Sequence, residues 1–267
     1  MTPLAVGALA MAALIVLILL QVPIGFAMII VGVTGYALQA SWAPALTILA
    51  SEPSGLLASV DLATVPLFLL MGTFATAAGF SQDVYNAAAA LLGHRRGGLA
   101  YATIGGCAVF GAVCGSSTAT AATFAKAALP EMLKRGYAEG FSTGTIAAGG
   151  TLKSLIPPSI VMILYCIVAR TFIFDLFVAA LVPALIAIAV NLLAIWIVVR
   201  TRPSVAPLGE RVALDAKLAA LKRAAPVLVL MVAVFAGLYS GVFTVNEAGV
   251  PLVLPCPLNL NQHDRAN

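Results

Sequence analysis

Charge is scarce in this sequence of 267 residues. Only 9% of the residues are Asp, Glu, Lys or Arg, whereas 62% are hydrophobic and the mean hydropathy is +1.07. Because soluble domains carry about 25% charged residues, this shortage excludes an ordinary soluble protein and predicts a polytopic membrane protein. The net charge of +4 is interpreted as a bias of the loops, since Lys and Arg gather in cytoplasmic loops. No nucleic-acid partner is therefore expected.

Residues that build metal, redox or catalytic sites are few as well. The chain has four Cys and two His, with no CxxC spacing and no cluster of His. Neither a disulfide nor a cofactor is expected, and the cysteines are interpreted as small apolar residues. An integral membrane enzyme is disfavoured because no HExxH motif and no paired carboxylates occur in the apolar runs. A channel is disfavoured because no filter motif is visible.

The long runs of Ala, Leu, Ile and Val predict an all-α protein, and one stretch from Gly105 to Ser159 stands out within them. Small and polar residues interrupt it twice, at Cys114–Thr118 and at Gly149–Thr151, and Pro157-Pro158 follows the second interruption. In lipid each unpaired backbone group costs several kcal/mol, so a broken helix must face protein or a water-filled cavity. Two such breaks predict a site for Na⁺ or an anionic substrate. The alternative is that the small residues only allow close helix packing.

The first hundred residues predict four segments. The apolar run 4–38 is too long for one span of about 20 residues and predicts a kinked or paired helical segment. Residues 41–60, with two prolines, predict a loop, and 62–78 predict a spanning helix. The segment 81–92 is short and partly polar, which predicts an interfacial helix capped by Ser81.

Basic residues then predict the topology of the rest of the chain. Arg95-Arg96 precedes the run 99–132 and Lys134-Arg135 follows it, so both ends should be cytoplasmic and the run should form a re-entrant hairpin. Residues 137–170 should cross once as a helix broken at 149–151. The run 173–199 should cross back, a cytoplasmic connector with one amphipathic helix should occupy 200–223, and 224–239 should cross again.

Several ungapped blocks carry a resemblance to a known family. They read CGSSTATAATFAKAALPEMLKRGY, TGTIAAGGTLKSLIPPSI and GLYSGVFTVNEA, and they occur in this order. The chain resembles the large permease subunit, of the DctM type, of tripartite ATP-independent periplasmic (TRAP) transporters. The resemblance covers residues 1–249, and residues 250–267 form a divergent tail.

The resemblance implies a fold and a function. The fold would be an ion-transporter-superfamily-like first repeat, with a re-entrant hairpin and a broken transmembrane helix, that works as an elevator. The transporter would sit in the bacterial inner membrane and move organic acids such as C4-dicarboxylates with Na⁺ as the coupling ion. Its partners would be a small membrane subunit of the DctQ type and a periplasmic substrate-binding protein of the DctP type.

The resemblance also implies site residues. The hairpin tip and the broken helix would bind substrate and ion through Ser116, Ser117, Thr118, Gly149, Gly150 and Thr151. Na⁺ would lie at Ser116, Ser117, Thr118, Gly150 and Thr151, while Gly115, Pro157 and Pro158 would shape the helix breaks. Hydroxyls of this kind can instead bond to carbonyls one turn back in a helix.

Two features depart from the family pattern. Lys153 and Ser154 stand where many members have small or apolar residues, and a buried Lys would repel Na⁺ unless it snorkels away or pairs. The family chain is also longer and carries a second repeat, so this chain is expected to be truncated after the first one. Such a chain is expected to insert without transporting, and a non-transporting fragment is therefore the alternative function.

Overall fold

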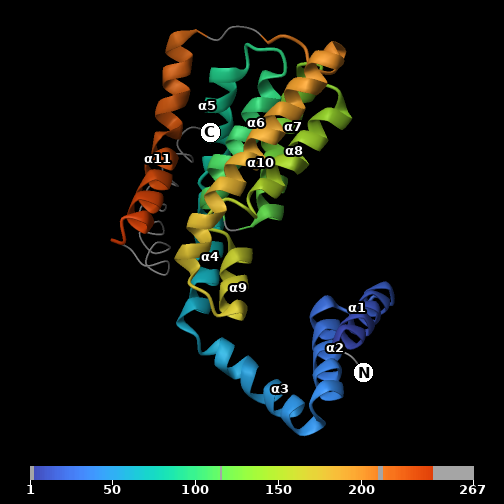
Figure 1. Ribbon diagram of the computed structural model, residues 1–267. Helices are drawn as coiled ribbons and strands as arrows, with labels where there is room; N and C mark the ends of the chain where they lie inside the picture. Colours follow the sequence, from blue (N-terminus) through green and yellow to red (C-terminus); the bar gives the residue numbers. More distant parts are fainter. Residues whose placement is uncertain (1–2, 115, 210–212, 243–267) are drawn as a thin grey trace. The chain divides into compact units, whose positions relative to one another are not determined.

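The computed structural model describes residues 3–114, 116–209 and 213–242, and within these ranges every regular element is helical (Figure 1). The chain divides into two compact units, Met1–Ser59 and Val60–Asn267, which are described separately. Their long apolar helices agree with the predicted all-α polytopic membrane protein. The divergent tail, residues 250–267, lies outside the described residues.

The first unit consists of three helices, α1 (Pro3–Leu19), α2 (Ile24–Gln39) and α3 (Trp42–Leu57). The run 4–38 is therefore a pair of helices, as one of the two predicted alternatives has it. They are separated at Gln21, whose φ of 62° is left-handed, and at Pro23, which precedes α2. α2 contacts both α1 and α3. Most of the large apolar side chains of α1 and α2 remain exposed, as expected for lipid-facing helices.

The loop predicted for 41–60 is wrong, because α3 occupies most of it. Pro44 lies in the first turn of α3, where its missing N–H leaves no hydrogen bond unmade. Pro53 lies inside the helix, which continues past it to Leu57. The two prolines predicted a loop only because their positions within a helix were not considered.

The second unit begins with the 3₁₀ helix η1 (Val60–Ala63), α4 (Thr64–Ala77) and α5 (Phe80–Leu92). α4 and α5 are apolar enough to form one span together, but they are bent by 63°. Gly79 makes this bend with a φ of 75° and stands at the N-cap position of α5. The predicted cap at Ser81 is wrong, since Ser81 is buried within the helix. α5 also contacts α6, α7 and α11, so it belongs to the packed unit and is not a separate surface helix.

The predicted hairpin is present as α6 (Gly98–Val113) and α7 (Ser117–Lys134). Contacts between the two helices pair early residues of α6 with late residues of α7. At the open end, the hydroxyl of Thr103 donates to the sulfur of Met132 at 3.8 Å. Nearer the tip, the rings of Phe110 and Phe124 lie 5.9 Å apart. The two helices are therefore antiparallel, and they turn at Cys114–Ser116.

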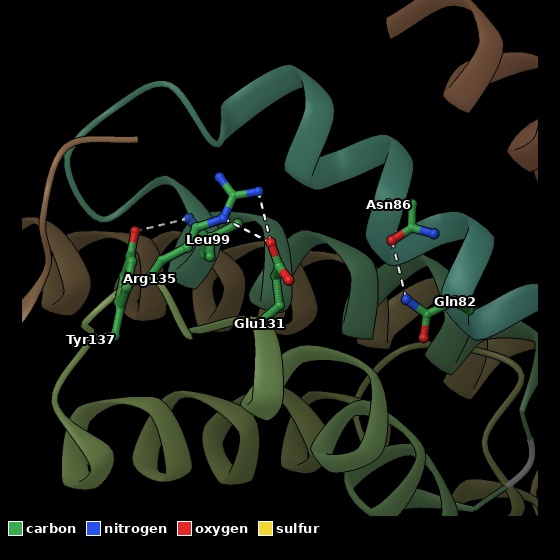
Figure 2. Close-up of polar contacts among 6 residues, drawn as sticks. All are labelled: Gln82, Asn86, Leu99, Glu131, Arg135 and Tyr137. Carbon is green, nitrogen blue, oxygen red and sulfur yellow. Dashed lines mark hydrogen bonds and ion pairs between the residues drawn. The ribbon is translucent and has the colours of Figure 1, made fainter. Parts of the chain in front are cut away.

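Polar contacts occur at the open end of this hairpin, and one of them connects the start of α6 to the segment after α7. The backbone N–H of Leu99 donates to the hydroxyl of Tyr137 at 3.3 Å, and Arg135 forms an ion pair with Glu131 at 2.8 Å (Figure 2). Gln82 and Asn86 bond to each other on α5 in the same view. Burial raises the pKa of the Tyr137 phenol, which keeps the acceptor of the Leu99 bond neutral.

The loops that carry the basic residues meet at this same end. The N–H of Ala138 donates to the carbonyl of Val205 at 3.0 Å. Gly209 packs so closely on Gly93 that a Cβ atom added to it would lie 2.0 Å from the Gly93 carbonyl oxygen. The loops at 93–97, 134–138 and 203–209 therefore lie together, which agrees with the common side predicted from their charge. Residue 210 lies outside the described residues.

Four more helices complete the unit: α8 (Glu139–Leu152), α9 (Ile160–Ala169), α10 (Ile173–Thr201) and α11 (Leu214–Tyr239). By length and hydropathy α10 and α11 can each cross a membrane. α11 starts within the predicted connector and runs on without interruption, so the separate amphipathic helix expected in 200–223 is wrong. Between α10 and α11 the described residues include one 3₁₀ turn, η2 (Pro203–Val205).

The convergence of the basic loops generates a topology prediction. With the native cysteines replaced, Arg135→Cys should resist an impermeant thiol reagent added outside intact cells, because it lies at the basic, cytoplasmic end. Thr171→Cys is the matched control. It lies between α9 and α10, at the far end of the crossing, and should label strongly. Strong external labelling at position 135 would contradict the hairpin topology.

Candidate functional site

The tip of the α6–α7 hairpin carries a group of hydroxyls at the start of a helix. Ser116 is the N-cap of α7, and its Oγ accepts the N–H of Ala119 at 3.3 Å. The hydroxyls of Ser116 and Thr118 lie 2.9 Å apart. Ser116 and Ser117 are half-buried and Thr118 is exposed. Gly115 lies outside the described residues.

Hydroxyls that bond to a carbonyl one turn back do occur on α7, but at Thr120 and Thr123 and not at the described residues of the tip. Thr120 donates to the carbonyl of Ser116 at 2.9 Å, and Thr123 donates to that of Ala119 at 2.7 Å. Both hydroxyls are thereby used within the helix. The N-terminus of α7 keeps the hydroxyls of Ser116 to Thr118 at its positive dipole end, where oxygen ligands and anions are both accommodated.

Gly149, Gly150 and Thr151 do not form the second break, so its predicted position is wrong. All three lie in the last turn of α8. A Cβ atom at Gly149 would come within 2.8 Å of the Cys107 sulfur, and one at Gly150 would come within 2.6 Å of the Ala121 Cβ. The glycines therefore let α8 approach both arms of the hairpin. Gly149 and Gly150 therefore allow close helix packing, which was the alternative interpretation of the small residues.

Thr151 is also engaged within its own helix. Its hydroxyl donates to the carbonyl of Ala148 at 2.8 Å. Its carbonyl accepts the hydroxyl of Ser154 at 2.7 Å and the N–H of the same residue at 3.1 Å. The oxygens of Thr151 are thus occupied by local bonds. The structure leaves the hydroxyls of Ser116 to Thr118 together at the tip and places Gly149, Gly150 and Thr151 in helical packing.

The broken helix itself is present, and its break begins four residues later than predicted, at Lys153 instead of Gly149. α8 ends at Leu152 and α9 begins at Ile160, with Ser159 as the N-cap position. Pro157 and Pro158 lie in this break, and two consecutive residues without an N–H disfavour a continuous helix. The prolines were the correct signal, whereas the double glycine was not. Pro157 and Pro158 thus lie between α8 and α9, and their role in shaping the break stays a prediction.

Lys153 fills the break from within. Its Nζ donates to the carbonyl of Ile156 at 3.3 Å and to the carbonyl of Pro158. Lys153 is 1% exposed, the most deeply buried cation in the described part of the chain. Of the two arrangements expected for a buried Lys153, snorkelling away or pairing, the structure shows pairing, with backbone carbonyls.

The stem of Lys153 joins the break to the hairpin. A Cβ atom at Gly111 would lie 3.3 Å from Cδ of Lys153, so the lysine stem packs directly on the last turn of α6. Gly111 stands one turn before Cys114, the first residue of the tip. The tip and the break are therefore neighbours. The tip offers hydroxyls at a helix start, and the break holds the buried side-chain nitrogen of Lys153.

One sequence pattern was overlooked. Residues 140–144, Gly-Phe-Ser-Thr-Gly, have the GxSxG spacing of a nucleophilic serine. In the structure they lie inside α8, and Ser142 is fully buried with its hydroxyl donating to the carbonyl of Ala138 at 3.0 Å. A nucleophile elbow requires an exposed serine at a strand-to-helix turn, so this segment supplies no catalytic serine.

Comparison with known proteins gives a consistent result. The profile of the DctM component of the tripartite ATP-independent periplasmic transporters matches residues 11–258. The C4-dicarboxylate TRAP transporter large permease protein DctM of Pseudomonas aeruginosa is 41% identical over 187 residues, which are 70% of this chain and 43% of that protein.

Two further relatives match a similar stretch. The protein of the same description from Rhodobacter capsulatus is 35% identical over 70% of this chain and 46% of its own length. The ectoine TRAP transporter large permease protein TeaC of Halomonas elongata is 34% identical over 73% of this chain and 45% of its own length. The chain spans about half the length of the curated relatives it matches.

The close packing of α8 yields a prediction with an internal control. Gly150→Ala should destabilise the protein by about 1–3 kcal/mol, because the new methyl group meets the Cβ of Ala121. Gly144→Ala, on the same helix with open space around it, should instead be neutral or stabilising by up to about 1 kcal/mol. Thermal unfolding in detergent micelles compares the two. Equal melting temperatures would show that α8 does not pack on α7 as described.

Proposed function

The chain belongs to the DctM family of tripartite ATP-independent periplasmic transporters, and on that premise we propose that it forms the membrane pathway for an organic acid. Transport in such a system needs a site at membrane depth that is open to polar ligands. The neighbouring hairpin tip and helix break are the observation that carries the proposal. Broken helices with free helix ends are where secondary transporters bind their substrates.

The chemistry of the hairpin tip supports an anionic substrate. Ser116, Ser117 and Thr118 lie at the N-terminus of the 18-residue helix α7, whose dipole is positive at that end. A carboxylate is an acceptor for both the hydroxyls and the first N–H groups of such a helix. The buried ammonium of Lys153 on the neighbouring break adds positive potential to the same region.

The class of substrate is proposed from the relatives. Two of them are named as C4-dicarboxylate permeases and one as an ectoine permease. All of these compounds carry a carboxylate, which the hairpin tip of this chain is suited to bind. We therefore assign an organic acid as the substrate class, with C4-dicarboxylates as the first to test.

The rest of the transport system is part of the same proposal. A small membrane subunit would pack against this chain in the bacterial inner membrane, and a periplasmic binding protein would deliver the acid. A Na⁺ gradient would drive transport by an elevator movement of the hairpin and the broken helix. Membership of the DctM family supports the small subunit, the binding protein and the Na⁺-driven elevator movement.

The test is made in a chimeric permease, because the chain spans about half the length of its relatives. The matching part of the Pseudomonas aeruginosa permease is replaced by this chain, and uptake of radiolabelled succinate is measured in proteoliposomes with the other subunits. Ser117→Ala should reduce uptake about tenfold at low substrate, as expected for the loss of one hydrogen bond to a charged group.

Thr47→Ala is the matched control. Thr47 is exposed and its hydroxyl donates to the carbonyl of Ala43 within α3, so its loss should leave uptake unchanged. Equal uptake by both variants would remove the hairpin tip from the substrate site. Absence of uptake by a chimera that inserts normally would favour the non-transporting alternative.

A further inference from the structure

The break between α8 and α9 contains a cation that belongs to the protein. Lys153 places its Nζ between the carbonyl oxygens of Ile156 and Pro158, which lie outside both helices. Two carbonyls in the break of a membrane helix are hard oxygen ligands of the kind that a small cation takes. In this chain the side-chain nitrogen of Lys153 donates to both of them.

The surroundings explain why that ammonium stays in place. Leu152, Ile156 and Ser159 are all buried, so the carbonyls of the break have little access to water. Lys153 also directly follows the last residue of α8, at a helix C-terminus, where a positive charge is favourable. An ionisable side chain at membrane depth is retained when it has such a function and such partners.

We propose that Lys153 is a tethered cation that occupies the carbonyls of the α8–α9 break in place of Na⁺, so that the hairpin and broken helix of this chain bind no Na⁺. The proposal rests on the transport function above and narrows it. A Na⁺ ion near these carbonyls would meet a fixed like charge, which repels it strongly where water is excluded. The hydroxyls of the hairpin tip are then left for the carboxylate of the substrate.

A Na⁺ ion that couples transport would on this proposal bind outside these 267 residues. Two of the residues that the family resemblance assigns to Na⁺ are already engaged in other contacts, which agrees with the proposal. The carbonyl of Thr151 accepts two bonds from Ser154. Gly150 is held against Ala121 in the last turn of α8. Lys153 is therefore a specificity-determining residue, because it sets which ion this part of the chain can hold.

The test uses the purified 267-residue chain in lipid nanodiscs and does not depend on transport. Melting temperatures are compared in NaCl and in choline chloride at equal ionic strength. The native chain should melt at the same temperature in both salts. Lys153→Met keeps the length of the stem but removes the charged donor, and should melt lower in choline by on the order of 5 °C because two buried carbonyls lose their partner. Na⁺ should restore at least half of that loss.

Lys126→Met is the matched control. Lys126 is an exposed lysine on α7, and its loss should neither lower the melting temperature nor create a response to Na⁺. A native chain that is stabilised by Na⁺ would overturn the proposal. So would a Lys153→Met chain that Na⁺ does not restore, or one that melts like the native chain in choline.

Binding of radioactive ²²Na⁺ keeps the proposal testable if Lys153→Met does not fold. The native chain and Lys153→Arg, which keeps the positive charge, should both show no saturable binding. Saturable ²²Na⁺ binding by the native chain would overturn the inference while leaving the organic-acid function standing. Failure of succinate uptake in the chimera would, in turn, leave these ion measurements unaffected.

Discussion

The need to satisfy backbone polar groups away from water governs the second unit of this protein. A membrane helix meets this need by itself, and any interruption must find other partners. Both interruptions here have found them. The side chain of Ser116 caps the first turn of α7, and the ammonium of Lys153 bonds to the carbonyls of the α8–α9 break. The side chains that bond to the unpaired backbone groups of the broken helices are polar. They therefore form the site and make it polar.

Much of this architecture can be predicted from the sequence, because the signals involved are local or cumulative. Basic residues on both sides of 99–132 predicted the hairpin, and its turn lies at the small residues after Val113. The prolines at 157 and 158 marked the broken helix. Such signals act within a few residues or add up over a whole span, so they do not require knowledge of tertiary contacts.

Several of the mistaken predictions share a cause, which is that the neighbours of a residue decide its role. Gly149 and Gly150 look like helix breakers in isolation, yet Cys107 and Ala121 lie against them and hold them in α8. Ser81 looks like a cap, but Gly79 adopts the left-handed conformation that ends the preceding turn. The partners of Lys153 could not be identified from the sequence either, because the path of the chain through the break sets the direction of its two carbonyls.

The glycine contact between α8 and α7 limits how this part of the protein can move. Ala121 lies against Gly150 with no room for even a methyl group between them, and Phe124 lies against Gly106 almost as closely. Contacts packed this closely are bistable and do not deform gradually. They stay shut or come apart entirely. The three helices α6, α7 and α8 should therefore travel as one rigid body, and any gate for a ligand must open along a different surface of that body.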